Sequence, residues 1–228
     1  MDRGIMDQEL NMSVKSFIPF YKLPEHIEIE CLFKLPFFHF EYDWFAEPLC
    51  MSATFLIGRN TENLYFAFMC TQKAFINENH QKNVYCEGLW KYDVAEFFIS
   101  DLKSGQYQEF NISPAGSWWT MLFSEYRKED HNNFKFPQKI EIFSLLTENS
   151  WQAALSIPTD QLSLDFSDLT KRTANVCAIV NGRDRKYLSW ANINSDKPDF
   201  HKYSSFLPIN LINNGAVFSN LMPKRVQI

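Results

Sequence analysis

Trp90 and Glu96 have side chains whose types and spacing suggest a recognisable chemistry. They lie within the segment LWKYDVAEFFISD, residues 89–101, where an apolar run predicts a β-strand. An indole ring can stack on the apolar face of a pyranose, and a nearby carboxylate can accept hydrogen bonds from sugar hydroxyls. The alternative for Glu96 is a solvated carboxylate on a sheet that is buried on one face only.

The strand at 94–100 must position Glu96. Side chains alternate between the two faces of a strand, so Ala95, Phe97 and Ile99 are expected to point into a core while Glu96 points away from it. The same alternation makes the adjacent Trp118 and Trp119 face opposite ways. Only one of those two rings can then stack on a given ligand.

Short apolar or alternating runs separated by turn residues recur along the chain and predict an all-β fold. The pattern is typical of an antiparallel β-sandwich, immunoglobulin-like or jelly-roll-like, with about ten strands and at most a short helix near Pro158. We expect strands at 52–58, 63–70, 94–100, 107–113, 119–127, 139–146, 151–157, 175–181, 186–191 and 206–211.

The first 50 residues differ from the remainder because prolines and aromatic residues are mixed in them. This composition predicts an N-terminal extension, residues 1–50, that wraps over a sandwich formed by residues 51–228, with an edge strand at His26 to Phe33. We expect one domain overall, with residues 1–15 mobile.

Three segments in order resemble the carbohydrate-binding module family 9-like domains, which are related to the DOMON domains. They are LWKYDVAEFFISDLKSGQYQEFNISPAG, WQAALSIPTDQL and YLSWANINSDKPDFHKYSSFLPINL, which lie between residues 50 and 211. Their order and spacing match those of four motifs in the family. These are a strand that carries an acid and follows a Trp, a hairpin, a W-x-x-x-x-x-I-P segment, and a last segment that contains S-W.

The resemblance implies non-catalytic binding of a saccharide, at its chain end, between two tryptophans. By motif, Trp90 and Glu96 match the first Trp and its acid, Trp190 matches the late Trp, and Asn111 and Asn192 are further ligand-binding candidates. The family's acidic pair before the strand is Tyr92 and Asp93 here. No cofactor is expected, and calcium follows only from the resemblance.

Charge, cysteine spacing and the lengths of apolar stretches argue against several classes of protein. The net charge is −5, which argues against a nucleic-acid partner. The five cysteines are spread without a CxxC pair, and no apolar stretch approaches the length of a membrane span. The N-terminus has no apolar segment of signal-peptide length, so we expect a cytoplasmic protein, although the family is often extracytoplasmic.

Other functions stay open at this stage. A sandwich that has lost its ligand site could bind a protein partner through Trp118 or Phe45. Heme held by Met and His is a less favoured alternative. Asp199 and His201 are too few for a metal site, and His201 is expected to bond to backbone. No catalytic motif occurs, although Glu96 and Glu109 are a carboxylate pair of the kind that glycosidases use.

Overall fold

The computed structural model describes residues 15–180 and 182–213, which form strands and short 3-10 helices without an α-helix. The 3-10 helices are η1 (Ile29–Lys34), η2 (Leu89–Lys91), η3 (Thr159–Gln161), η4 (Leu169–Lys171), η5 (Gly182–Asp184) and η6 (Tyr203–Ser205). The strands are β1 (Ile18–Lys22), β2 (Phe38–His39), β3 (Ala53–Arg59), β4 (Asn63–Cys70), β5 (Val94–Asp101), β6 (Tyr107–Ile112), β7 (Trp118–Glu125), β8 (Lys128–Glu129), β9 (Glu141–Leu146), β10 (Trp151–Pro158), β11 (Arg172–Val180), β12 (Lys186–Ser189) and β13 (Leu207–Ile212).

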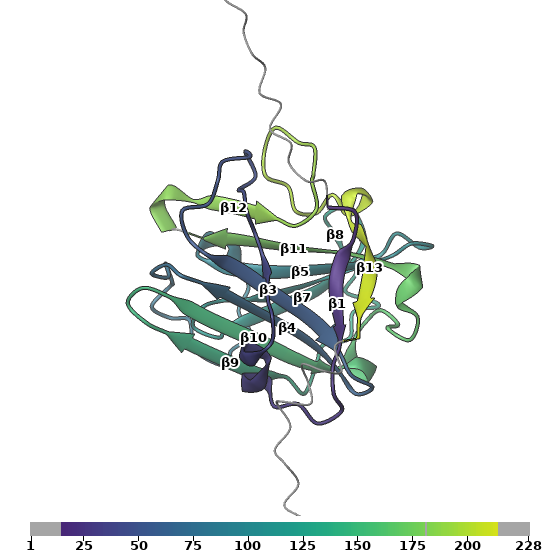
Figure 1. The fold of residues 1–228 in the computed structure, drawn as a ribbon. Coiled ribbons are helices and arrows are strands. Elements are labelled where there is room, and N and C mark those ends of the chain that lie inside the picture. The colour runs from purple at the N-terminus through teal and green to yellow at the C-terminus, as the bar shows by residue number, and fades with distance from the viewer. Residues whose placement is uncertain (1–14, 181, 214–228) are drawn as a thin grey trace, which may run out of the picture.

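The strands form two layers (Figure 1). We call β1, β3, β4, β10 and β9, with β2, the first sheet, and β8, β7, β6, β5 and β11, with β12, the second sheet. Strand β13 pairs with both β11 and β1 and therefore joins the two layers along one side. Pairing is antiparallel except at β1, which runs parallel to both β13 and β3.

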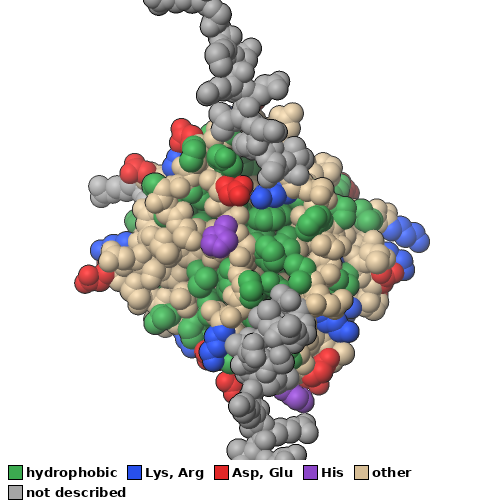
Figure 2. Space-filling view, in the orientation of Figure 1, with side chains coloured by type: hydrophobic (Ala, Val, Ile, Leu, Met, Phe, Trp, Pro, Cys, Tyr) green, Lys and Arg blue, Asp and Glu red, His purple; other side chains and the backbone are tan. Residues whose placement is uncertain are grey.

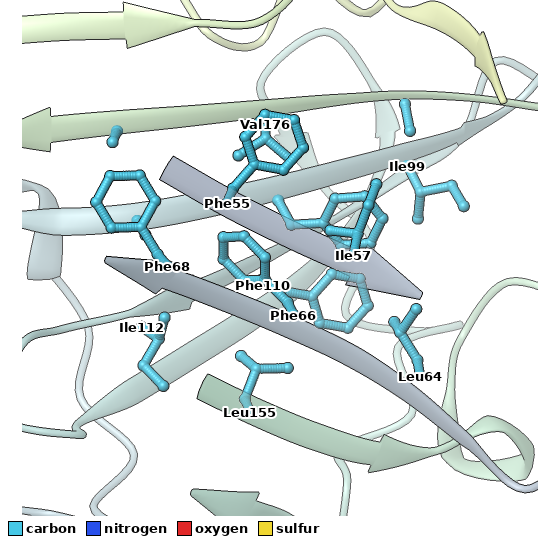
Figure 3. Close-up of a cluster of buried hydrophobic side chains, with 14 of the residues drawn as sticks. Phe55, Ile57, Leu64, Phe66, Phe68, Ile99, Phe110, Ile112, Leu155 and Val176 are labelled. Carbon is cyan, nitrogen blue, oxygen red and sulfur yellow. The ribbon is translucent and has the colours of Figure 1, made fainter. Parts of the chain in front are cut away.

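The main hydrophobic core lies between the two sheets (Figure 3). Phe55 and Phe66 point inward from β3 and β4, and they meet Phe110 and Val176 from β6 and β11. Phe97 on β5 stacks on Phe110, with ring centroids 5.7 Å apart. The abundant phenylalanines of this chain therefore fill the space between the layers.

The outer face of each sheet is also partly covered. Helix η1 packs over the first sheet, where Ile29 and Leu32 join Tyr21 and Leu56 in a second cluster. Figure 2 shows hydrophobic side chains gathered near the middle of the view, over the first sheet. On the second sheet a third cluster forms around Phe98 and is covered by the loop that contains Phe200.

The predicted all-β sandwich is confirmed, and each of the ten expected strands has a counterpart within a few residues. The expected short helix is η3, directly after Pro158. The edge strand predicted at His26 to Phe33 is wrong, because Ile29–Lys34 is the 3-10 helix η1. Trp118, considered as a protein-binding ring, is buried in the main core instead.

The N-terminal segment contributes to the sheet itself. Strand β1 lies between β13 and β3, with Ile18 and Phe20 completely buried in the main core. Farther along, Trp44 contacts Phe200 with ring centroids 5.8 Å apart, and its Nε1 donates to the Ser195 carbonyl over 3.1 Å. The segment thus reaches the second sheet as well as the first.

Candidate functional site

A row of polar and aromatic side chains crosses the outer face of the second sheet. Glu96 on β5 is paired with Asn111 on β6 and with Cys177 on β11. Asn111 is paired in turn with Trp119 on β7. Paired residues share a face, so this register brings side chains from four strands to one surface.

A cleft of about 400 Å³ opens over this surface. The second sheet supplies its floor, and the other lining residues come from η2, the turn between β7 and β8, the link between η5 and β12, and the loop at 198–201. The lining residues are Trp90, Glu96, Glu109, Trp119, Phe123, Arg127, Glu129, Ile179, Arg185, Tyr187, Pro198, Phe200 and His201.

Trp90 supplies an accessible ring at the cleft. It lies in η2, immediately before β5, and the helix is preceded by Gly88 with φ of 79°, a left-handed conformation that favours glycine. Its side chain is 38% exposed. One edge contact fixes the ring, because Trp90 and Trp119 meet with centroids 5.9 Å apart and planes at 74°. The second ring is buried, which leaves Trp90 as the exposed partner of the pair.

Glu96 and Glu109 bring two buried carboxylates to the same cleft. Glu109 is paired with Phe98, two residues along β5 from Glu96, so the two acids are diagonal neighbours on one face. Burial raises the pKa of Glu96 well above its ordinary value, and the charge of Glu109 raises it further. Burial also raises the pKa of Glu109, while Asn111 and Arg127 oppose that rise. The interpretation of Glu96 as a solvated carboxylate is therefore wrong.

Asn111 lies beside the carboxylates and does not line the cleft. Its Nδ2 donates to Glu109 Oε1 over 2.8 Å, which holds one oxygen of that carboxylate. Glu109 Oε2 is buried and has no hydrogen-bond partner among the residues that the structure describes. The Asn111 amide thus orients the Glu109 carboxylate so that one oxygen has a hydrogen-bond donor and the other has none.

His201 stands next to that unsatisfied oxygen. Its Nδ1 lies 2.9 Å from the Tyr107 hydroxyl, and its Nε2 lies 3.7 Å from Glu109 Oε2. Burial lowers the pKa of His201 to about 4, with the nearby Arg127 acting in the same direction. The ring is therefore neutral at pH 7. Its expected bond to backbone is replaced by the bond to the Tyr107 side chain.

The two arginines at the cleft are engaged by other groups. Arg127 Nη2 lies 2.9 Å from Asp199 Oδ1, and the other oxygen of Asp199 accepts from the Tyr126 hydroxyl over 2.8 Å. Arg185 donates to the Lys91 carbonyl. Both contacts connect loops around the cleft, and neither arginine forms an ion pair with Glu96 or Glu109 among the contacts seen in the described residues.

The comparisons with known proteins agree with this architecture. A family model described as carbohydrate-binding family 9 matches residues 34–211. The chain belongs to this family. No curated protein matches the sequence.

Solved structures similar to this family 9 chain share its fold. A putative carbohydrate-binding protein from Bacteroides uniformis aligns with a TM-score of 0.66 and 18% identity, over 86% of this chain and 98% of that chain. A family 9 module from Caldicellulosiruptor kristjanssonii in complex with cellotriose gives 0.56 and 10%, over 92% and 97%. The same module with glucose gives 0.57 and 10%, over 92% and 99%.

The structure does not bring Trp190 of this family 9 chain to the cleft that Trp90 lines. Ser189 pairs with Cys177 on the outer face, so the next residue turns to the opposite face. The Trp190 ring packs edge-on against Phe55, with centroids 5.0 Å apart, and its Nε1 donates to the Phe17 carbonyl. The expectation that the Trp90 and Trp190 rings oppose each other is therefore corrected.

Trp190 and Asn192 line a separate, smaller pocket of about 90 Å³. The Lys15 ammonium sits 4.6 Å from the centroid of the Trp190 ring, and it also pairs with Glu41 over 3.6 Å. Trp190, which matches the second Trp of the family 9 pattern, thus packs in this chain between the N-terminal segment and the core.

Several cleft residues of this family 9 chain were not predicted from the sequence. Tyr187 was not predicted, although it lies three residues before Trp190. It is two positions from Ser189 on β12, so the alternation of side chains along the strand places both residues on the outer face. Arg127 and Phe200 reach the cleft from turns and loops, where periodicity carries no signal. The sequence indicates Glu109 as one acid of a carboxylate pair, and the structure places it in the cleft.

Metal ligation is not apparent in the described part of this family 9 chain. No three His, Cys, Asp or Glu side chains gather there in an arrangement that could hold a metal ion. Asp93 instead accepts from the backbone N–H groups of Phe75 and Gly182, each over 3.1 Å. No helix of the described chain has the length and apolarity needed to cross a membrane.

Proposed function

We propose that the protein binds a saccharide without cleaving it, in the cleft lined by Trp90, Glu96 and Glu109. The observation that carries the proposal is the exposed Trp90 ring beside buried carboxylates. A ring can cover the apolar face of a sugar while the acids bond to its hydroxyls, and ligand sites commonly combine apolar walls with a few convergent polar groups.

The size of the cleft favours a short ligand or a chain end. Its volume of about 400 Å³ is near the lower end of the ~300–1,000 Å³ that is typical of small-molecule sites. The complexes of the Caldicellulosiruptor module with cellotriose and glucose support a saccharide of this kind. Tyr187 and Phe200 supply further aromatic surface, which replaces the role first expected of Trp190.

Calorimetry on Trp90→Ala tests the proposal. Glucose, cellobiose and cellotriose are titrated into the wild type and the variant, and we expect the variant to lose at least about tenfold in affinity, equivalent to ~1.4 kcal/mol. Phe45→Ala is the matched control, because Phe45 is an exposed aromatic that does not line the cleft.

Two results would overturn this assignment. One is a panel of neutral gluco- and xylo-saccharides and of amino saccharides that gives no heat with the wild type. The other is equal binding by the wild type and Trp90→Ala. Chromatography of the bound saccharide after long incubation should recover it intact, and shortened products would instead assign a glycosidase to the Glu96 and Glu109 pair.

A further inference from the structure

The acidic groups in the floor of the cleft lack a cationic partner. Glu96 and Glu109 are 4% and 3% exposed, and no lysine or arginine forms an ion pair with either of them among the described residues. Buried carboxylates are normally paired, protonated or bound to a ligand. We propose that the cleft recognises an amino sugar, whose ammonium group binds between Glu96 and Glu109; this inference rests on the saccharide-binding function proposed above.

The strongest support is the state of Glu109 Oε2. This oxygen is buried and unpartnered, while the other oxygen of the same carboxylate is held by Asn111. Glu109 lines the cleft, so this carboxylate belongs to the wall that a ligand would contact. An unsatisfied buried acceptor destabilises the folded protein, more so when it is charged, and a donor from the ligand would remove that cost.

His201 does not supply that donor in the free protein. The Tyr107 oxygen already accepts from the Arg127 backbone N–H over 2.9 Å, so its own hydrogen is free to be donated to His201 Nδ1. This tautomer leaves the remaining His201 hydrogen on Nε2, directed toward Glu109 at 3.7 Å, which is too long for a hydrogen bond. The described residues therefore leave Glu109 Oε2 without a hydrogen-bond donor.

The charge of Arg127 lowers the pKa of both acids, but its guanidinium forms no ion pair with either of them among the described residues. The Arg127 guanidinium is paired with Asp199, and Arg185 bonds to a backbone carbonyl. Glu129 adds a further carboxylate at the cleft, paired with His131 over 3.0 Å. Because both arginines are engaged by other groups, the two carboxylates remain available to a ligand cation, and a ligand ammonium is compact and carries three donors for them.

Strand geometry fits a single cation between the acids. Diagonal neighbours on antiparallel strands have their backbones ~7–8 Å apart, so two glutamate side chains can approach one small group from both sides. Trp90 would cover the apolar face of the same sugar ring, and a neutral sugar would place a hydroxyl where the amino sugar places its nitrogen.

Binding of the ammonium should release a proton. In the free protein the two acids are diagonal neighbours on one face of the sheet, with Cys177 beside Glu96 on β11, Arg127 and Glu129 at the turn, and His201 in the loop. Burial and mutual repulsion raise the pKa of Glu96, so the pair retains a proton that two separate surface glutamates would lose. When the ammonium forms its ion pair, that proton leaves to solvent as the carboxylic acid becomes a carboxylate.

Calorimetry with matched disaccharides tests the inference at pH 7. The β-1,4-linked dimer of glucosamine, its N-acetylated form and cellobiose are titrated into the wild type, Glu109→Gln and Glu125→Gln. Glu125 is an exposed acid on β7 outside the cleft and serves as the control. We expect the amino dimer to bind the wild type and the control at least about tenfold more tightly than cellobiose, with that ratio falling toward one in Glu109→Gln.

Repeating the titrations in buffers of different ionisation enthalpy should show proton release for the amino dimer and none for cellobiose. Equal or weaker binding of the amino dimer by the wild type would overturn the inference while the saccharide-binding function stands. If neither dimer binds, the proposed function fails with it. A ratio unchanged by Glu109→Gln would also overturn the placement of the ammonium.

Discussion

Burial sets the chemistry of individual residues in the cleft more than residue type does. Glu96 and Glu109 are ordinary acids by sequence, but the covering loop that contains Phe200 and His201 removes them from water. The same covering makes His201 neutral at pH 7. Donor and acceptor roles in the cleft therefore follow from how the surrounding loops pack.

A pH-dependent stability follows from the two buried acids. Their pKa values are raised by burial in the folded protein, so the folded state binds more protons than the unfolded state above pH ~4.5. The free energy of unfolding should therefore fall as the pH rises from ~4.5 through the raised values, by up to ~1.4 kcal/mol per pH unit for each acid that the folded state still holds protonated.

Glu109→Gln should flatten this fall, because glutamine carries no proton to lose. Urea unfolding at several pH values between 5 and 9 measures it, with Glu125→Gln as the exposed control. Profiles for the wild type and Glu109→Gln that run parallel would contradict the prediction.

At the scale of single residues, the sequence predicts which face of the sheet a side chain occupies, but it does not predict how deeply that side chain is buried. Alternation along the strand placed Ala95 and Phe97 inward and Glu96 outward, as the structure shows. The burial of Glu96 could not be predicted, since the residues that cover it are about a hundred positions away. The direction in which the Trp190 side chain points was not predicted for a related reason. It depends on the register of β12 on β11, which the sequence of neither strand determines by itself.

Strands with a strong apolar pattern were predictable, and those without one were not. The ten expected runs all became strands, whereas β1, β2 and β8 were missed. Strands β2 and β8 contain only two residues each, and β1 includes Pro19, which weakens a strand assignment. Strand β1 forms because partners on both sides pair with it.

Close packing between β1 and β3 yields a prediction at Gly58. A Cβ atom at this position would lie 2.7 Å from the Tyr21 carbonyl oxygen and 2.9 Å from its Cβ, so backbone would have to move. Gly58→Ala should push β1 away from β3 at one of their two registered pairs and lower the free energy of unfolding by about 2 kcal/mol.

Chemical denaturation measures the effect of Gly58→Ala. Lys22→Ala is the control on the same strand, because Lys22 is the exposed end of β1 and its truncation creates no clash. An unchanged unfolding midpoint for Gly58→Ala would show that β1 can shift without loss.

At the scale of the whole molecule, the two sheets meet along one side through β13 and β1. Strand β13 shares only two registered pairs with β11 but four with β1. The family match begins at residue 34, so it omits β1, although that strand lies inside the sheet. The part of the chain that resembles the family is therefore smaller than the part that forms the sandwich.

This difference predicts that residues 34–213 do not form a stable unit, whereas residues 15–213 do. Removal of β1 takes Ile18, Phe20 and Tyr21 from buried positions, at ~1.5–3 kcal/mol for each large apolar side chain. It also removes the strand that pairs with Gly58 and Arg59 of β3 and with one edge of β13. The combined loss is about 5 kcal/mol or more, which is comparable to the whole stability of many domains.

Urea unfolding followed by tryptophan fluorescence separates the two fragments. The longer fragment should unfold in one cooperative transition, and the shorter one should show a broad transition or none. Because the cleft lies on the second sheet, away from β1, loss of saccharide binding by the shorter fragment would follow from loss of folding and not from loss of a contact. A shorter fragment with the same midpoint as the longer one would mean that β13 and β3 can close the sandwich without β1.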